Sequence, residues 1–160
     1  MIAVTTRRRL TLTVQHAADD ADLPARGLLR RCVAAALERD ADITLRFVER
    51  DEARLLNRRY RRQDRPTNVL SFVYDDERDV LHGDIVLCAP VLRREAEQQG
   101  KALAAHCAHL VVHGTLHLQG YDHLDTADAQ RMEAREAAIL AGLGYADPYA
   151  TGRPRRRGAR

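Results

Sequence analysis

The sequence predicts a single α+β domain in which a mixed four-stranded sheet packs with about five helices. Short segments with an apolar residue at every second position alternate with longer segments whose apolar residues recur every three or four positions. These are the patterns of half-buried strands and of amphipathic helices. The chain has 160 residues, of which 45% are hydrophobic, and this is the size of one ordinary domain with one core. We therefore expect one domain over residues 1–150 and a disordered basic tail over 151–160.

Four segments are predicted to be strands, namely 8–15, 43–48, 69–74 and 85–88. In the first of them Leu10, Leu12 and Val14 alternate with polar residues, so one face is buried and the other is solvated. The last two strands are separated only by a short acidic segment, and we expect them to pair antiparallel. Strands that are joined through a helix are more naturally parallel, so the sheet should be mixed.

The predicted helices run from 22 to about 37, over 51–60, 90–99 and 102–118, and from 125 or 126 to 143. Asp22 is a suitable N-cap for the first of them, and Pro24 fits its first turn. Gly100 separates the third helix from the fourth, and Gly144 ends the last. The fourth helix is long and largely apolar.

Composition excludes several classes of protein. No apolar run approaches the roughly 20 residues that a membrane-spanning helix needs, and the segment MIAVTTRRRL lacks the layout of a secretion signal. Cys32, Cys88 and Cys107 are scattered without C-x-x-C spacing, so they form neither a disulfide framework nor a zinc knuckle. We expect reduced, mostly buried thiols in a cytoplasmic protein without a membrane partner. The net charge of +3 does not by itself indicate nucleic acid, although the arginines are clustered.

Histidine spacing predicts a metal site at the end of the long helix. His113 and His117 are four residues apart, so their rings project from one helix face about 6 Å apart. Gly120 can adopt a positive φ just past the helix, which would let His123 return to the same point. Three imidazoles that leave a fourth tetrahedral position open are typical of catalytic zinc. Because three histidines also accept Ni²⁺, Cu²⁺ or Co²⁺, the sequence predicts one Zn²⁺ or a similar divalent ion.

The same residues match the zinc-binding string HExxHxxGxxH of metzincin peptidases at every histidine and at the glycine. Gly114 replaces the glutamate, which in those enzymes activates the metal-bound water. A zinc peptidase with an unusual base is therefore one alternative function. The simplest alternative, a pair of ordinary hydrogen-bonded helix histidines, does not account for the coincidence of three histidines with a turn glycine.

The remaining histidines and one aspartate leave more than one interpretation open. His106 and His109 are either partly buried polar residues or a rim that contacts substrate or orients a ligand. His16 and His82 are expected at the surface. Asp122 either orients a metal ligand or caps the turn before His123.

The string HGTLHLQGYDH, preceded by AHLVV, resembles the signature of the YbeY family of bacterial rRNA maturation endoribonucleases. The segments LNRRYRRQDRPTNVLSF, GDIVLC and MEAREAAILAGLGYADPY are similar to further blocks of that family, so the resemblance covers most of the span 55–149. It implies a mixed sheet covered by helices, with His113, His117 and His123 as metal ligands. Val73 stands where the family often has proline, and we expect this departure to alter a strand end and not the chemistry.

The resemblance also implies that Arg61 is important for activity and that the substrate is ribosomal RNA, especially the 3′ end of the small-subunit (16S) precursor. A planar guanidinium suits bidentate phosphate contact, so Arg61 is assigned to substrate positioning and transition-state charge. The predicted substrate-binding residues are Arg58, Arg59, Arg62, Arg65 and His109. Together the arginines would provide sequence-independent affinity that falls as salt rises, although each alone is ambiguous. The residues expected to shape the loop are Asp64, Thr67, Asn68 and Ser71.

The predicted function is therefore a metal-dependent endoribonuclease that matures the 3′ end of 16S rRNA and aids ribosome biogenesis and quality control. Its predicted partners are ribosomal RNA and the small ribosomal subunit, while ribosomal-protein or GTPase partners cannot be read from the sequence. A third alternative is a non-catalytic ribosome-associated factor whose metal is structural, which the arginine clusters would also suit.

Overall fold

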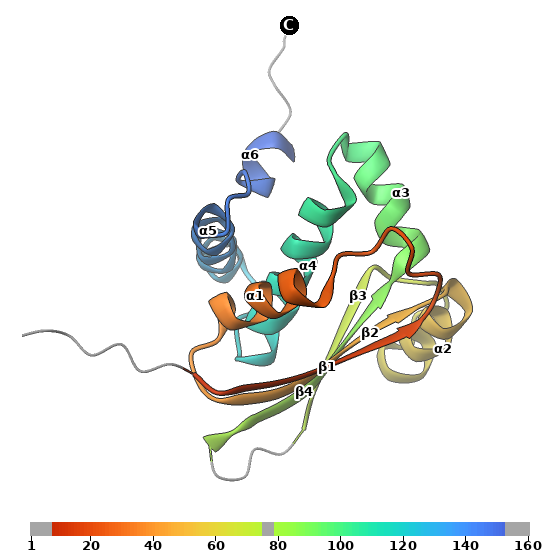
Figure 1. The fold of residues 1–160 in the computed structure, drawn as a ribbon, viewed down its shortest axis with the longest axis horizontal. Coiled ribbons are helices and arrows are strands. Elements are labelled where there is room, and N and C mark those ends of the chain that lie inside the picture. The colour runs from red at the N-terminus through yellow and green to blue at the C-terminus, as the bar shows by residue number, and fades with distance from the viewer. Residues whose placement is uncertain (1–7, 75–78, 153–160) are drawn as a thin grey trace, which may run out of the picture.

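Strands and helices alternate from Leu10 to Arg61, two strands then follow each other, and after Cys88 the described residues form helices and loops. The computed structural model describes residues 8–74 and 79–152, and within them the elements are β1 (Leu10–Ala17), α1 (Arg26–Ala36), β2 (Ala41–Val48), α2 (Arg50–Arg61), β3 (Val69–Tyr74), β4 (Leu81–Cys88), α3 (Ala89–Gln99), α4 (Leu103–Leu118), α5 (Thr126–Gly142) and α6 (Pro148–Gly152) (Figure 1). The predicted α+β class is confirmed. The short helix α6 is an addition to the five that the sequence predicts. It includes the first two residues of the predicted 151–160 tail, and residues 153–160 lie outside the described residues.

The sheet has the strand order β1-β2-β4-β3. β1 pairs parallel with β2, β2 pairs parallel with β4, and β3 pairs antiparallel with β4. The predicted mixed sheet is therefore confirmed, for the predicted reason: among the described residues β3 and β4 are consecutive elements, whereas a helix separates β1 from β2 and β2 from β3. β4 is central and is buried from Ile85 to Cys88, as a strand covered on both faces requires.

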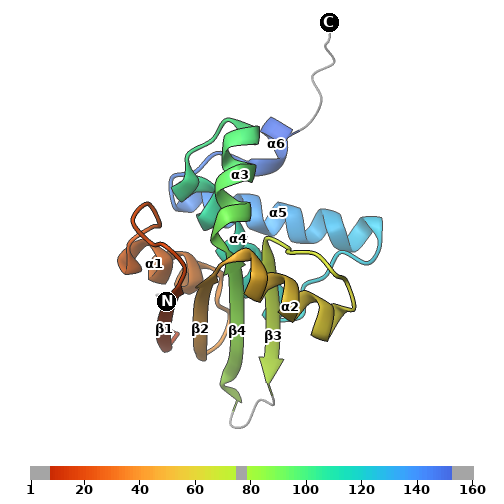
Figure 2. The ribbon, with the colours of Figure 1, turned by 90° about the vertical axis from the view of Figure 1, so that its right-hand side faces the viewer.

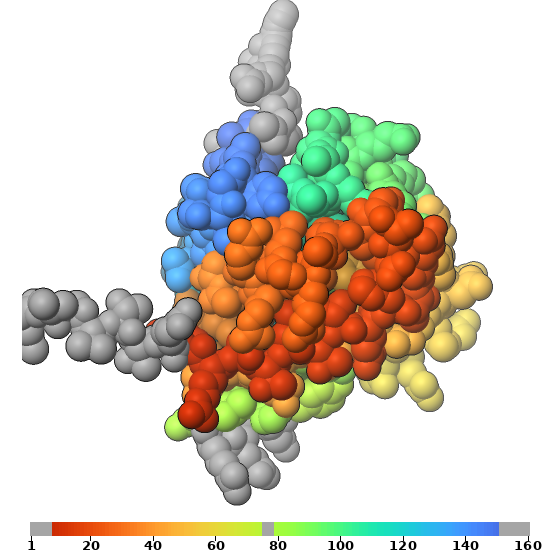
Figure 3. Space-filling view, in the orientation of Figure 1, coloured from red at the N-terminus to blue at the C-terminus, as the bar shows by residue number. Residues whose placement is uncertain are grey.

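Helices cover the two faces of the sheet unequally. α1 and α4 lie on one face and α2 lies on the other, which is clearest when Figure 1 is compared with the turned view of Figure 2. The larger core lies under α1 and α4 and contains Ile43, Leu45 and Phe47 of β2. A smaller core under α2 includes Val48 and Leu70. In Figure 3 residues of α1, in orange, form the front surface between those of β1, in red, and those of α5, in blue.

α4 is the most buried helix, since it packs against the sheet and against α1, α3 and α5. Its buried residues are His106, Cys107, Ala108, Leu110, Val111, Val112, Gly114, Thr115, Leu116 and Leu118. The side chain of Gln119 ties the end of this helix to the end of α1, because its amide donates to the Ala36 carbonyl at 2.8 Å and its Oε1 accepts from the Glu38 backbone at 2.7 Å. The end of α4 is thereby held in a defined position.

The first helix begins later than the sequence predicts. α1 starts at Arg26 with Ala25 as its N-cap, and Asp22 does not cap it. Asp22 instead accepts hydrogen bonds from the Arg93 guanidinium at 2.7–3.0 Å, and these bonds lower the pKa of its carboxyl. The local capping signal was therefore wrong because a long-range ion pair uses the same side chain.

Two other expectations from composition can be compared with the structure. Cys32, Cys88 and Cys107 are free and buried, as predicted, and burial raises the pKa of Cys32 to about 11 and that of Cys107 to about 12. None of the helices in the described ranges combines the length and the apolar character that crossing a membrane requires.

Gly83 allows the end of α4 to approach β4. A Cβ on this residue would lie 2.9 Å from both terminal methyl groups of Leu118 and 3.0 Å from the Phe72 carbonyl oxygen. We expect Gly83→Ala to lower the free energy of unfolding by about 1–3 kcal/mol, because the packed neighbours have to move. Urea denaturation followed by circular dichroism measures this change.

Gly27→Ala is the matched control, because a Cβ there meets nothing within 4 Å. A glycine in the first turn of α1 costs backbone entropy that alanine does not, so this change should be neutral or raise stability by about 0.4–1 kcal/mol. Equal effects of the two substitutions would show that the contact with Leu118 does not limit the packing of α4.

Candidate metal centre

The three histidines of the predicted metal site share one cavity with Arg61. The cavity has a volume of about 500 Å³ and is lined by Arg61, Asn68, Val69, Ser71, His113, His117, Asp122, His123 and Leu124. It forms where the end of α2, the start of β3, the end of α4 and the loop before α5 meet. A larger hollow of about 800 Å³ lies between β1 and α1, but no histidine or carboxylate lines it.

The three rings form a nearly regular triangle. Their centroids are 6.5 Å apart for His113 and His117, 5.8 Å for His113 and His123, and 6.5 Å for His117 and His123. Around a tetrahedral zinc the centroids would be roughly 5 Å apart, so the rings would have to close by roughly 1 Å to share an ion. In keeping with this spacing, no three histidine, cysteine or carboxylate side chains within residues 8–74 and 79–152 are already at metal-binding distances.

Hydrogen bonds determine the tautomers of two of these histidines. His113 Nδ1 lies 2.6 Å from a Glu136 carboxylate oxygen, and His117 Nδ1 lies 3.0 Å from the Tyr121 carbonyl oxygen. A carboxylate and a carbonyl only accept hydrogen bonds, so each Nδ1 donates and each Nε2 keeps its lone pair. Burial also lowers the pKa of His117, which favours the neutral ring. The donor set therefore suits a borderline-soft divalent cation such as Zn²⁺.

Gly120 supplies the turn that completes the triangle. Its φ is +99°, in the left-handed region that favours glycine, and it follows directly on the end of α4. The turn brings the Tyr121 carbonyl to His117 and brings His123 to the cavity. Asp122 accepts a hydrogen bond from the His123 backbone at 2.7 Å, so it stabilises this turn while it also lines the cavity.

Glu136 is a functional candidate that the sequence reasoning missed. Its side chain is fully buried in α5, where it also accepts from His109 Nε2 at 3.0 Å and from the Tyr149 hydroxyl. Burial raises its pKa, but hydrogen bonds from His109 and His113 outweigh that effect and hold the pKa at about 2, so the carboxylate is ionised at neutral pH. The sequence does contain a sign of this role: Glu136 lies on the same face of the helix as the apolar residues Met132 and Ile139, and a glutamate on a buried face needs hydrogen-bond partners.

His109 is placed on this carboxylate and does not line the histidine cavity. Its Nε2 lies between Glu136 and Tyr149, and within the described residues its buried Nδ1 has no hydrogen-bond partner. His106 is buried and contacts Glu95 at 2.9 Å. Of the two alternatives that the sequence leaves open for His109, the structure places it as a partly buried polar residue, and Glu136 links it to His113.

Gly114 occupies a position where a larger side chain has little space. A Cβ there would lie 3.0 Å from Ile85 Cγ2 and 3.2 Å from Ser71 Oγ. A glutamate at this point would have to push α4 away from the sheet. Close packing therefore explains why the glutamate of the metzincin string is absent at this position. Without that general base, the peptidase alternative has less support.

Only Arg61 of the five predicted arginines lines the cavity. It is the last residue of α2, and Arg62 ends that helix with a φ of +57°. The other predicted substrate-binding arginines, which are Arg58, Arg59, Arg62 and Arg65, are exposed around the same helix end and the loop after it. The loop is held from within, because the buried Asn57 donates to the Arg65 carbonyl at 2.9 Å.

The sequence profile of the family described as Endoribonuclease YbeY matches residues 13–144. The chain belongs to this family. The Endoribonuclease YbeY of Nitrosomonas europaea is 55% identical over 142 residues, covering 89% of this chain and 86% of that protein. The Endoribonuclease YbeY of Thiobacillus denitrificans is 57% identical over 141 residues, covering 88% and 96%. The resemblance that the motifs indicated is thus confirmed.

A solved structure supports the fold of this YbeY-family chain. The solution structure of a Thermotoga maritima protein superposes with a TM-score of 0.54 and covers 94% of this chain and 100% of its own. At 21% identity it bears on the fold alone. The architecture of sheet and helices described above is therefore shared with an experimentally determined protein.

Glu136→Gln tests whether the buried carboxylate orients a metal ligand. The substitution keeps the shape of the side chain and removes the charge that accepts from His113, so we expect the affinity for Zn²⁺ to fall about 10- to 100-fold. Competition with a coloured chelator measures this affinity. Glu133→Gln removes a charge from the same helix, near Tyr149, but Glu133 is half-buried and accepts a hydrogen bond from neither His109 nor His113, so this variant should leave the affinity unchanged. Equal zinc affinity in both variants would contradict the orienting role.

Proposed function

We propose that this chain is a metal-dependent endoribonuclease that cleaves ribosomal RNA, as the names of its close relatives indicate for endoribonuclease activity. In finer detail, we propose maturation of the 3′ end of 16S rRNA on the small ribosomal subunit in the cytoplasm. The observation that carries the proposal is the convergence of three histidine rings and Arg61 on one cavity. Such a cavity combines ligands for a cation with a fixed positive charge for a phosphodiester.

His113, His117 and His123 are proposed to hold one Zn²⁺ through ring nitrogens, with a fourth position left to solvent or phosphate. When bound, such an ion supplies Lewis-acid polarisation of a phosphate oxygen, or lowers the pKa of a coordinated water toward about 7. Glu136 and the Tyr121 carbonyl hold two of the rings in the required tautomer. These contacts reduce the reorganisation that binding requires.

Arg61 is proposed to bind the scissile phosphate. Its guanidinium lies on the cavity wall at the end of α2, across from the histidines. Negative charge grows on the phosphate oxygens during cleavage, and a bidentate guanidinium stabilises that charge. The exposed arginines around the same helix end extend the positive surface along the path of the RNA backbone.

The two alternative functions have less support. A peptidase would need a general base that Gly114 does not provide. A purely structural metal would be expected to have four protein ligands, whereas the three histidines face a cavity shared with an exposed arginine.

His117→Ala should abolish RNA cleavage and remove most of the bound metal, because it deletes one of three ligands. Cleavage of precursor 16S rRNA, metal content per chain and circular dichroism measure the three properties together. The exposed His16 provides a matched control, since His16→Ala should retain metal and activity. Full cleavage by a metal-free His117→Ala variant would refute the proposed function.

Arg61→Ala should lower the cleavage rate about 10²- to 10³-fold while metal content stays unchanged, because a transition-state contact is lost and no ligand is removed. Arg61→Lys should recover only part of this loss, since an ammonium cannot make the bidentate contact. The exposed Arg59 lies outside the cavity lining, so Arg59→Ala should cost much less. Loss of metal from Arg61→Ala would instead assign Arg61 a structural role.

A further inference from the structure

A second pocket lies on the other face of the sheet, between α2 and strands β2, β3 and β4. It has a volume of about 250 Å³ and is lined by Arg46, Glu52, Leu56, Tyr60, Phe72, Tyr74, Asp84 and Val86. The chain contains five tyrosines and two phenylalanines, and two of the tyrosines and one phenylalanine meet here. We call this the aromatic pocket.

The rings of the aromatic pocket are unusually exposed. Tyr60 is 58% exposed and Tyr74 is 53% exposed, which places both among the few large apolar side chains that reach the surface. The Tyr60 and Phe72 rings meet edge to face, with centroids 5.1 Å apart and an interplanar angle of 68°. Phe72 packs on the smaller core, so it anchors an aromatic surface that faces solvent. Exposed, rigid rings beside a pocket are typical of a stacking site.

The aromatic pocket and the histidine cavity are separated only by the edge strand β3 and the last turn of α2. Side chains of β3 alternate between the two, since Val69 and Ser71 line the histidine cavity while Phe72 and Tyr74 line the aromatic pocket. Phe72 is three residues from Val69, or about 10 Å along the strand. The last turn of α2 also contributes to both sites, because Arg61 lines the histidine cavity and Tyr60 lines the aromatic pocket.

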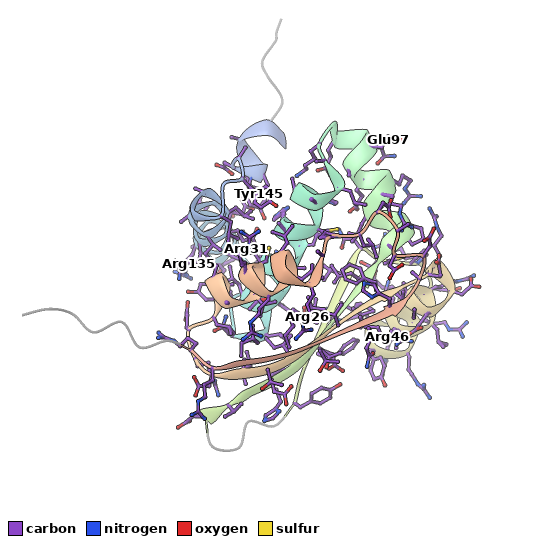
Figure 4. All side chains as sticks on the ribbon, viewed as in Figure 1. Arg26, Arg31, Arg46, Glu97, Arg135 and Tyr145 are labelled. Atoms are coloured by element: carbon purple, nitrogen blue, oxygen red, sulfur yellow. The ribbon has the colours of Figure 1, made fainter. Side chains whose placement is uncertain are left out.

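The charges around the two sites differ, so each site suits a different chemical group of a ligand. Inside the aromatic pocket Arg46 is neutralised by a bidentate pair with Glu52 at 2.7 and 2.9 Å, and the Tyr74 hydroxyl donates to Asp84 at 2.5 Å. Arg46 lies beside α2, on the side of the sheet away from α1 (Figure 4). Outside the pocket, the end of α2 carries Arg59, Arg61 and Arg62. A phosphate is therefore attracted to the helix end, whereas a neutral, flat group suits the pocket.

We propose that the aromatic pocket stacks one unpaired base of the RNA strand whose scissile phosphate lies at Arg61. This inference rests on the proposed function, and it adds that the strand passes around the β3 edge with a base on Tyr60. Bases in single strands can be splayed out onto aromatic side chains, whereas bases in a duplex are already stacked. The strand must therefore be unpaired one or two nucleotides from the cleaved bond.

Tyr60→Leu tests the inference, because it keeps apolar volume and removes the ring. Loss of one base–aromatic stack should weaken binding of a short single-stranded rRNA oligonucleotide about 5- to 100-fold, measured by fluorescence anisotropy on metal-free protein to prevent cleavage. Tyr60→Phe should bind like the unsubstituted chain. Leu55→Ala is the matched control, since Leu55 is 47% exposed on the same helix and lines neither site.

An abasic scan separates stacking from a general effect on the fold. Removing the base at one position should weaken binding to the unsubstituted chain by the same factor as Tyr60→Leu, and should cause no further loss in that variant. The chain has no tryptophan, so 2-aminopurine at that position can be excited without protein background, and its quenching should disappear in Tyr60→Leu. If removing the base weakened binding by the same factor in the unsubstituted chain and in Tyr60→Leu at every position, the inference would be overturned.

The outcomes distinguish this inference from the proposed function. If the unsubstituted chain cleaves precursor rRNA but Tyr60→Leu binds RNA with equal affinity, the base site is wrong and the function stands. If binding depends on Tyr60 and on one base but no cleavage occurs with any divalent ion, the base site stands and the function is wrong.

Discussion

The close packing of α4 on the sheet determines where every other part of the site lies. Gly83 on the strand and Gly114 on the helix leave no room for side chains at the contact, so the helix lies directly on β3 and β4. Most of α4 is buried, and its histidines at 113 and 117 are the part that reaches the cavity. A metal site on such a helix inherits the rigidity of the core, whereas a site on a loop would not.

The buried carboxylate of Glu136 shows how electrostatics adds to this packing. Burying an ion without partners is costly, but three donors from α4 and α6 surround this one. The network therefore connects α5 and the C-terminal helix to the same residue that is proposed to bind metal. His109, which the sequence could only assign to one of two roles, has a defined position within it.

The edge formed by β3 and the last turn of α2 separates the histidine cavity from the aromatic pocket. On one side lie imidazole nitrogens and a guanidinium, and on the other lie aromatic rings beside the Arg46–Glu52 ion pair and the Asp84 carboxylate. Because a strand directs successive side chains to opposite faces, six residues of β3 are enough to serve both sides. An extended polymer of phosphates and bases has the same two components, which is why we assign both sites to one strand of RNA.

Short-range patterns in the sequence determined much of this structure. Alternation and helical periodicity identified the four strands and five of the helices, and the absence of a helix between two strands predicted their antiparallel pairing. The i, i+4 histidines and the turn glycine identified the candidate ligands, because all of these lie within eleven consecutive residues. Local reasoning failed at Asp22, whose partner Arg93 is 71 residues away.

Only the tertiary structure decided which distant side chains meet. Glu136 is 23 residues from His113, and Tyr149 is 40 residues from His109, so no local pattern relates them. The aromatic pocket likewise depends on how α2 crosses the sheet, which follows from the packing of a whole core. Sequence periodicity indicates which face of a helix or strand is buried. Which other helix or strand packs against that face depends on the free energy of the complete fold.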